Sequence, residues 1–298
     1  MTLPPVDPRG ILFSIDFEDF SHDLKRDLGL WQTGPIRGEA LWRAYGEIEA
    51  FLRRLAGCPR ITFFCTGIVA EQAPDLVARI AADGHEIACH YHFHDEMDRQ
   101  SAGEVEANVV AAKVALERAS GAPVRGFRAP KFRIEKHDPA QYRVIERHFA
   151  YDSSWFGGST ADLAEFRARN GLTGLRILPI FEGRVVAGGP KLKLGGSYFK
   201  LFPGWASRKL VAGAFAAGFQ PHIYLHPYEF CRTGDFLLSR DELAALGPKG
   251  RAYWSLRQHQ WSTLGNRSVE GKLGAIFGSL RVMGRLGDLP HFTDFSCP

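Results

Sequence analysis

Residues 84–94 read GHEIACHYHFH, and this stretch decides how the rest of the chain is interpreted. It begins as an apolar strand and ends in three histidines at positions 90, 92 and 94. Imidazole is the commonest metal-binding side chain, and three in five residues is a high density for a chain with 11 histidines. If the strand ends at His90, the loop after it can fold His90 and His94 back onto one ion while His92 points elsewhere. The alternative is a histidine-rich loop or strand that holds no metal.

A second cluster of charged residues follows the apolar strand 11–15. The chain there reads ILFSIDFED, so Asp16, Glu18 and Asp19 come directly after residues expected to be buried. Three carboxylates in that position are unfavourable unless positive charge lies among them, and a metal or an arginine would supply it. The alternative is an ordinary helix start, with an N-cap aspartate and an acid in the first turn.

Strand-like apolar runs alternate with segments of helical periodicity along most of the chain. The alternation, with loops of a few residues, predicts parallel strands wrapped by helices. The expected strands cover 11–15, 61–67, 85–90, 124–130, 149–155 and 221–230, and the expected helices cover 39–55, 74–82, 102–120, 139–148 and 205–217.

Residues 156–200 break this alternation. They are rich in glycine and contain short β-like pieces at 176–181 and 184–187, so we expect a hairpin-bearing insertion. After residue 240 the pattern is mostly helical, through 257 and again over 268–281, and the tail 288–298 is irregular. The chain shows no internal repeat, low-complexity tract or linker, which predicts one domain over 1–298.

The composition is that of an ordinary globular protein. Hydrophobic residues make up 45% and charged residues 23% of the chain, and the formal net charge is only +4. Lysine and arginine are spread without runs, so nucleic-acid binding has no compositional support, and no apolar run reaches the ~20 residues that span a bilayer. The N-terminus lacks a signal-peptide pattern, and the five cysteines are odd in number without CxxC spacing. These features predict a cytoplasmic protein with free thiols.

Five polar motifs stand at the ends of predicted strands, where an α/β barrel collects its catalytic groups. In order and spacing they resemble the motifs of the polysaccharide deacetylases, carbohydrate esterases of the NodB-homology fold. The resemblance covers roughly residues 10–232 and is greatest to the intracellular exopolysaccharide-locus branch. The motifs are Asp16/Glu18/Asp19, His90/His94, Arg128-Ala129-Pro130, Asp152 and His226-Pro227.

The resemblance implies an α/β fold, a distorted (β/α) barrel, with a divalent ion, usually zinc, held by one acid and two histidines. His90 and His94 match the histidine ligands, and Asp16 matches the general base that activates water. The third ligand stays open, because the family has two adjacent aspartates where this chain reads DFED. Glu18 lies on the same side of the strand as Asp16, whereas Asp19 keeps the residue type.

The remaining motifs match supporting groups. His226 would give a proton to the leaving amine, Arg128 would pair with Asp16 and tune it, and Asp152 would orient or stabilise a neighbouring group. Each also has a structural alternative: a buried salt-bridge partner for Arg128, a turn cap for Asp152, and a core histidine for His226.

The resemblance therefore predicts a metal-dependent hydrolase that removes an N-acetyl group from an amino sugar, in a glycan or glycan precursor of surface polysaccharide biosynthesis. The metal would be Zn²⁺ or another divalent transition ion. Three alternatives stay open: a deformylase or cyclic-amide hydrolase of the same fold, an inactive carbohydrate-binding homologue suggested by the departure at Glu18 and Asp19, and a metal-independent glycosidase that uses Asp16 and Asp152.

Overall fold

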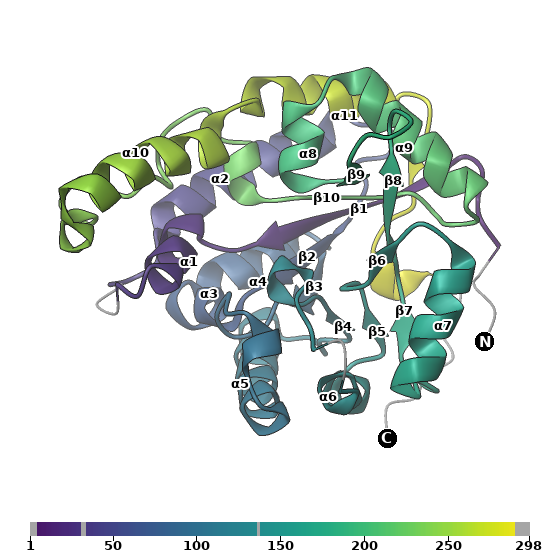
Figure 1. Ribbon diagram of the computed structural model, residues 1–298, viewed down its shortest axis with the longest axis horizontal. Helices are drawn as coiled ribbons and strands as arrows, with labels where there is room; N and C mark the ends of the chain where they lie inside the picture. Colours follow the sequence, from purple (N-terminus) through teal and green to yellow (C-terminus); the bar gives the residue numbers. More distant parts are fainter. Residues whose placement is uncertain (1–4, 31–33, 136–137, 290–298) are drawn as a thin grey trace.

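A computed structural model describes residues 5–30, 34–135 and 138–289 (Figure 1). Its centre is a curled sheet of parallel strands in the order β10-β1-β2-β3-β4-β5-β7, with β11 paired to the start of β1. The strands are β1 (Gly10–Phe17), β2 (Thr62–Cys65), β3 (Glu86–Cys89), β4 (Gly126–Phe127), β5 (Tyr151–Asp152), β7 (Arg176–Ile177), β10 (His222–Leu225) and β11 (Arg281–Val282).

Helices connect the strands and cover the outer side of the sheet (Figure 1). The longest, α5, begins with a reciprocal capping box between Ser101 and Glu104 and ends at Gly121, whose φ of 67° suits glycine. The helices are α1 (Phe20–Asp27), α2 (Gly38–Arg53), α3 (Gly67–Gln72), α4 (Pro74–Ala82), α5 (Ala102–Ser120), α6 (Ala140–His148), α7 (Thr160–Asn170), α8 (Gly196–Leu201), α9 (Gly204–Ala216), α10 (Gly247–Thr263) and α11 (Val269–Phe277).

The alternation of side chains along β1 separates two cores. Its odd-numbered residues, from Ile11 to Phe17, belong to the large core between sheet and helices. Leu12 lies on the other side, within the curl of the sheet, and the next residues on that side are Ser14 and Asp16. Along β1 the interior side of the curl therefore changes from apolar at Leu12 to polar at Ser14 and Asp16. The apolar end consists of Leu12, Phe64, Ala88, Tyr151, Leu178 and Leu286.

A smaller sheet brings the two edges of the curl together. It contains β6 (Phe156–Gly157), β8 (Ile180–Arg184) and β9 (Lys191–Lys193), with β8 and β9 antiparallel. An isolated bridge joins Gly195, just after β9, to Tyr224 in β10. The hairpin thus connects the β7 side of the main sheet to its opposite edge, which confirms the expected distorted barrel and the hairpin-bearing insertion.

Most predicted helices are confirmed within two residues, and the helical C-terminal region is confirmed by α10 and α11. The predicted strands are shorter in the structure, and 221–230 is a strand only over His222–Leu225, followed by the 3₁₀ helix Pro227–Glu229. Two helical segments also differ. Helix α7 occupies part of the insertion expected to hold only a hairpin, and its single buried apolar residue, Leu163, explains why the sequence shows little periodicity there. The last helix ends at Phe277 rather than near 281, because Arg281 and Val282 pair with β1.

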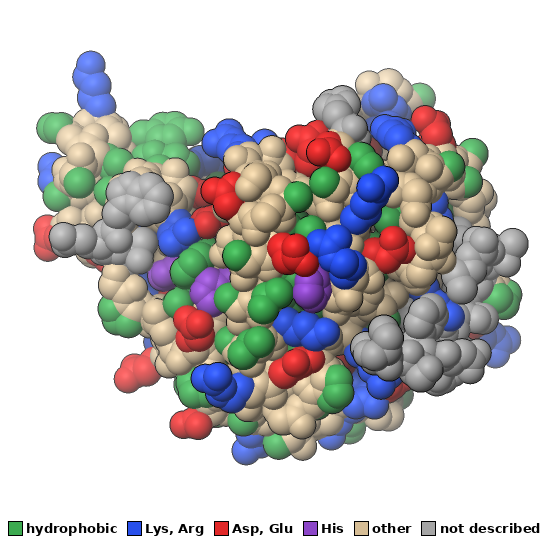
Figure 2. All heavy atoms as spheres, turned by 90° about the horizontal axis from the view of Figure 1, so that it is seen from below, with side chains coloured by type: hydrophobic (Ala, Val, Ile, Leu, Met, Phe, Trp, Pro, Cys, Tyr) green, Lys and Arg blue, Asp and Glu red, His purple; other side chains and the backbone are tan. Residues whose placement is uncertain are grey.

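No helix of the described residues is long and apolar enough to cross a bilayer. The described cysteines, Cys58, Cys65, Cys89 and Cys231, are free thiols, while Cys297, residues 1–4 and most of the predicted irregular tail lie outside the described residues. On the face seen in Figure 2, basic and acidic side chains are interspersed. Basic and acidic side chains also form ion pairs, for example Arg133 with Glu96 at 2.7 Å.

Candidate metal centre and active site

The loop after β3 turns the two outer histidines of the motif toward one point. Tyr91, between them, has a left-handed backbone with φ of 68°, which is uncommon for a bulky residue and typical of functional sites. Its carbonyl and that of His92 accept hydrogen bonds from the first residues of α3, at 2.8 and 3.0 Å, which hold the turn. The His92 ring instead packs against Phe93, with 4.4 Å between ring centroids, so it points away from the other two as expected.

Glu18 completes a three-residue cluster with these histidines. Its Oε2 lies 3.2 Å from His90 Nε2 and 2.9 Å from His94 Nε2, and the three possible ligand atoms lie within 4.8 Å of one another. Glu18 Oε2 is buried and has no hydrogen-bond partner among the described residues. Carboxylate oxygen and imidazole nitrogen are the donors that zinc and similar ions take. The donor set therefore fits a divalent metal.

The groups around the cluster orient its histidines and favour a bound cation. His90 Nδ1 lies 2.8 Å from the backbone carbonyl of Arg128, which fixes the hydrogen on Nδ1 and leaves the Nε2 lone pair directed at the cluster. Burial alone would lower the pKa of His94, but the Glu18 charge outweighs it and raises that pKa to about 9. The same carboxylate charge favours a divalent cation, which competes with protons for imidazole nitrogen.

Behind the cluster, Arg128 and Asp16 form a fully buried ion pair. Arg128 Nη1 donates to Asp16 Oδ1 at 2.5 Å and to Ser14 Oγ at 2.9 Å, while Nη2 donates to Ser153 Oγ at 2.8 Å. The guanidinium lies 4.1 Å over the ring of Phe64. A buried arginine with this many partners is rigidly held, so it fixes the direction of the Asp16 carboxylate.

His226, after β10, faces the cluster from the opposite side. Its Nε2 lies 3.9 Å from Glu18 Oε1, and its ring stacks on Tyr228 with centroids 5.0 Å apart and planes 12° from parallel. Glu229 accepts a hydrogen bond from the His226 backbone N–H at 2.9 Å and faces Nδ1 at 3.2 Å. The carboxylate thus favours the hydrogen on Nδ1 and leaves Nε2 for the site. Burial would lower the pKa of His226, but Glu229 outweighs it and raises the pKa.

Glu229 and Lys200 are the residues that the sequence analysis missed. Both side chains are fully buried, and Lys200 Nζ lies 3.9 Å from Glu229 Oε1, on the side of the carboxylate away from His226. The spacing of three residues between His226 and Glu229 was a signal, because it places both on one short turn, the 3₁₀ helix Pro227–Glu229. Lys200 gave no signal, because it comes from α8 in the insertion.

Two predicted site residues do not join the cluster. Asp19 is the N-cap of α1: one oxygen accepts from Ser21 N at 2.9 Å, and the other accepts from Arg37 N at 2.6 Å. Of the two acids left open as third ligand, the structure places Glu18 in the cluster and assigns Asp19 to the cap. The Asp152 side chain points to the outer side of β5. Its carboxylate accepts a hydrogen bond from Ser154 N at 3.1 Å, so it caps the turn that follows the strand.

The cluster opens into a cavity of about 650 Å³, a volume within the range of small-molecule sites. Asp16, His226 and the three cluster residues line it together with aromatic side chains from several elements, namely Phe20, Phe132, Tyr198, Tyr224, Tyr228 and Trp261. Charged groups at the base and aromatic walls suit a ligand with both polar groups and apolar ring faces.

Part of this chain is similar to known proteins. Residues 54–140 match the family model described as polysaccharide deacetylase. A chitooligosaccharide deacetylase from Sinorhizobium fredii is 39% identical over 70 residues, which cover 23% of this chain and 33% of the relative. One from Bradyrhizobium sp. is 36% identical over 70 residues, covering 23% and 32%. The matched segment thus spans about a third of these curated relatives.

Among solved structures, a candidate polysaccharide deacetylase from Mycobacterium smegmatis aligns over 97% of this chain and 99% of its own, with 19% identity and a TM-score of 0.49. The family-model match contains His90, His94 and Arg128, while Asp16, Glu18 and His226 lie outside it. Residues 54–140 are thus similar to the polysaccharide deacetylase family, and both curated relatives are chitooligosaccharide deacetylases.

Proposed function

We propose that this protein is a metal-dependent hydrolase that removes an N-acetyl group from an amino sugar of a glycan or glycan precursor. The observation that carries the proposal is the convergence of Glu18, His90 and His94 at the base of a cavity also lined by Asp16 and His226. Amide hydrolysis needs an electrophile for the carbonyl, a base for water and an acid for the amine, and these residues supply or hold each of them.

Glu18, His90 and His94 would hold the cation, which supplies Lewis acidity toward the amide carbonyl and the attacking water. Asp16 would take the proton from that water, because it lines the cavity while Arg128 holds one of its oxygens. His226 would give a proton from Nε2 to the leaving amine, since Glu229 holds the opposite ring nitrogen. Asp152 would act only through Ser154, whose hydroxyl accepts a hydrogen bond from Ala129 N at 2.8 Å, beside Arg128.

The proposal also specifies the metal, the substrate and the cellular compartment. Zinc suits a site of one carboxylate and two imidazoles, although other divalent transition ions bind the same donors. We propose a precursor of a surface polysaccharide as substrate, in line with the exopolysaccharide-locus motifs, and a single catalytic domain. The buried free thiols Cys65 and Cys89 favour a reducing, cytoplasmic setting.

The test is acetate release from N-acetylated chito-oligosaccharides and sugar nucleotides, with the metal content of the protein measured in parallel. We expect release to stop with a chelator and to return with zinc. Asp16→Asn should lose at least about a hundredfold in rate, because a positioned general base contributes roughly 10²–10⁴-fold. Asp75→Asn, an exposed first-turn acid of α4, is the matched control and should release acetate at the normal rate.

The outcomes separate the alternatives. A protein that holds stoichiometric metal but releases no acetate has a different acyl group, and formamides and cyclic amides are then the substrates to try. A protein that binds no metal is a carbohydrate-binding homologue rather than this hydrolase. Release that is unaffected by chelation would contradict the metal-dependent reading.

A further inference from the structure

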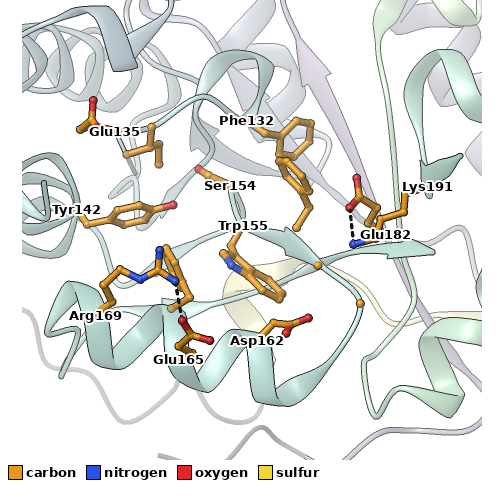
Figure 3. Close-up of a pocket in the computed structure, with 15 residues that line it drawn as sticks. Phe132, Glu135, Tyr142, Ser154, Trp155, Asp162, Glu165, Arg169, Glu182 and Lys191 are labelled. Carbon is orange, nitrogen blue, oxygen red and sulfur yellow. Dashed lines mark hydrogen bonds and ion pairs between the residues drawn. The ribbon is translucent and has the colours of Figure 1, made fainter. Parts of the chain in front are cut away.

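A second cavity, of about 340 Å³, lies on the insertion side of the barrel and takes no part in the proposed reaction (Figure 3). Its walls come from the loop after β4, from α6 and α7, and from β6, β8 and β9. Trp155 stands in the middle of the labelled residues, with Asp162, Glu182 and Tyr142 around it. The volume falls at the lower end of the range for small-molecule sites, about 300–1,000 Å³.

The indole of Trp155 is a fixed surface rather than a mobile side chain. Its ring lies so close to Gly157 that a Cβ at that glycine would come within 2.3 Å of it. Phe166 and Phe219 pack against it, with centroids 6.0 and 6.1 Å away. A platform held on several sides before a ligand arrives loses little conformational entropy on binding, and indole faces suit the C–H face of a pyranose.

The charge of this cavity is opposite to that of the whole chain, whose formal net charge is +4. Among the ion pairs of this lining, Glu165 lies 3.2 Å from Arg169, and Glu182 lies 3.8 Å from Lys191. The Asp162 carboxylate has no ion-pair partner within the described residues. The lining as a whole has four carboxylates and two cations, namely Glu135, Asp162, Glu165, Glu182, Arg169 and Lys191.

Glu182 is the most enclosed of the paired acids. Its side chain is only 19% exposed, whereas Lys191 is 56% exposed and sits at a long 3.8 Å. A largely buried carboxylate with so distant a partner retains attraction for a second cation that enters the cavity. Together with Asp162 on the other side of Trp155, it makes the space around the indole attractive to a positively charged ligand (Figure 3).

The second cavity shares a wall with the cavity of the metal centre. Phe132 lines both, and it adopts a left-handed backbone with φ of 58°. Lys193 Nζ, on the metal-centre side, lies 4.9 Å from the ring centroid of Phe132 and 3.5 Å from that of Phe156, on the other side. The two cavities therefore adjoin each other across this wall.

We propose that the second cavity binds a protonated amino sugar, namely a unit of the glycan that has already lost its acetyl group. The sugar ring would lie on Trp155, and its ammonium group would be attracted by Asp162 and Glu182. The inference rests on the proposed function for the source of that ligand. It deepens that function by making partly deacetylated oligosaccharides the preferred substrates of the metal centre.

Binding is tested first with monosaccharides, because that measurement does not depend on turnover. Protein-observed NMR titration should show glucosamine binding more tightly than N-acetylglucosamine or glucose, and increasing salt should weaken the binding. We expect Asp162→Asn with Glu182→Gln to weaken glucosamine binding by about three- to tenfold, the range for partly exposed charge pairs. Asp75→Asn removes an acid from the same first-turn position of α4 and should change nothing.

Substrate preference is tested second. Acetate release from a partly deacetylated chito-oligosaccharide should be faster than from the fully acetylated one, and the double variant should remove that preference while keeping the rate on the fully acetylated chain. Equal affinity for glucosamine and N-acetylglucosamine, or glucosamine binding that the double variant leaves intact, would overturn the inference. Absence of acetate release with charge-dependent glucosamine binding intact would instead count against the proposed function alone.

Discussion

The two ends of the barrel interior are built from the same strands by opposite chemistry. In the apolar layer, Leu12, Phe64 and Tyr151 pack together, and each is at most 3% exposed. Two residues further along β1 the same face carries Ser14 and then Asp16, and the Arg128 guanidinium rests on the Phe64 ring between the two layers. A single strand thus passes from an apolar layer to a buried ion pair within five residues.

The comparison indicates which part of the interior stabilises the fold and which part carries the reactive groups. Packing at the amino end stabilises the fold directly, because it removes apolar surface from water. The ion pair at the carboxyl end contributes little net stability, since burying two charges is expensive, but losing one partner is severe. If this division is right, changes at the amino end reduce stability and spare turnover, and changes at the carboxyl end affect turnover.

The largest effect should come from Arg128→Met. It leaves the Asp16 carboxylate buried without its cation, and we expect a loss of about 3–5 kcal/mol in the free energy of unfolding, measured by urea denaturation. Adding Asp16→Asn to the same protein should restore part of that stability, because the uncompensated charge is gone. A double variant no more stable than Arg128→Met would mean that the pair acts through packing rather than charge.

Leu12→Ala examines the opposite end. The cavity it leaves should lower the free energy of unfolding by about 2–4 kcal/mol, in the range of buried leucine truncations. The kcat of the remaining folded protein should stay within about twofold of normal, because no site residue contacts this position. A large fall in the kcat of fully folded Leu12→Ala protein would contradict the proposed division between a stabilising region and a reactive region.

A smaller effect is expected from Glu229→Gln, which removes the charge that orients and supports His226. We expect kcat to fall about ten- to hundredfold with little change in KM, because general acid catalysis as a whole contributes roughly 10²–10⁴-fold. The matched control is Glu49→Gln: Glu49 also faces a buried histidine, His85, at 2.5 Å, but far from the cavity. That control should lose stability without losing kcat, and an equal loss of kcat in both would contradict a positioning role for Glu229.

The last effect concerns Asp152 and depends on pH. Burial raises the pKa of this carboxyl to about 7, with Ser154 only partly opposing the shift. The folded state therefore keeps a proton that the unfolded state loses above its ordinary pKa of 3.8. Stability should fall as pH rises between about 4 and 7, by up to ~1.4 kcal/mol per pH unit from this group.

Asp152→Asn should remove this contribution. Urea midpoints measured at pH 5 and pH 7 should differ less in the variant than in the unmodified protein, while Asp75→Asn should show the normal difference. An unchanged pH dependence in Asp152→Asn would mean that Asp152 is ionised in the folded protein at pH 5.

The sequence predicted the architecture well because period-two and helical patterns report burial directly. It also predicted most of the strand ends that meet: Asp16, His90, His94 and His226 line one cavity. Arg128 holds Asp16 from behind, whereas Asp152 lies apart. Their catalytic roles stay predictions.

What the sequence left open depended on three-dimensional detail. The choice between Glu18 and Asp19 was decided by a backbone amide, Arg37 N, that reaches Asp19 from 18 residues away. Lys200 belongs to the insertion and Trp155 directly precedes it, and weak periodicity in the insertion hides both its helix and the second cavity.

The pairing of β1 has a consequence for how the chain is made. This strand leaves the ribosome early, yet its partners on one edge are β10 and β11, which begin at His222 and Arg281. For most of translation, a long apolar strand has only β2 beside it and an open edge on its other side. Such edges pair with foreign strands, and contacts so distant in sequence form slowly. Nascent chains that stop short of β10 should therefore depend on chaperones, because the partners that complete β1 begin only at His222.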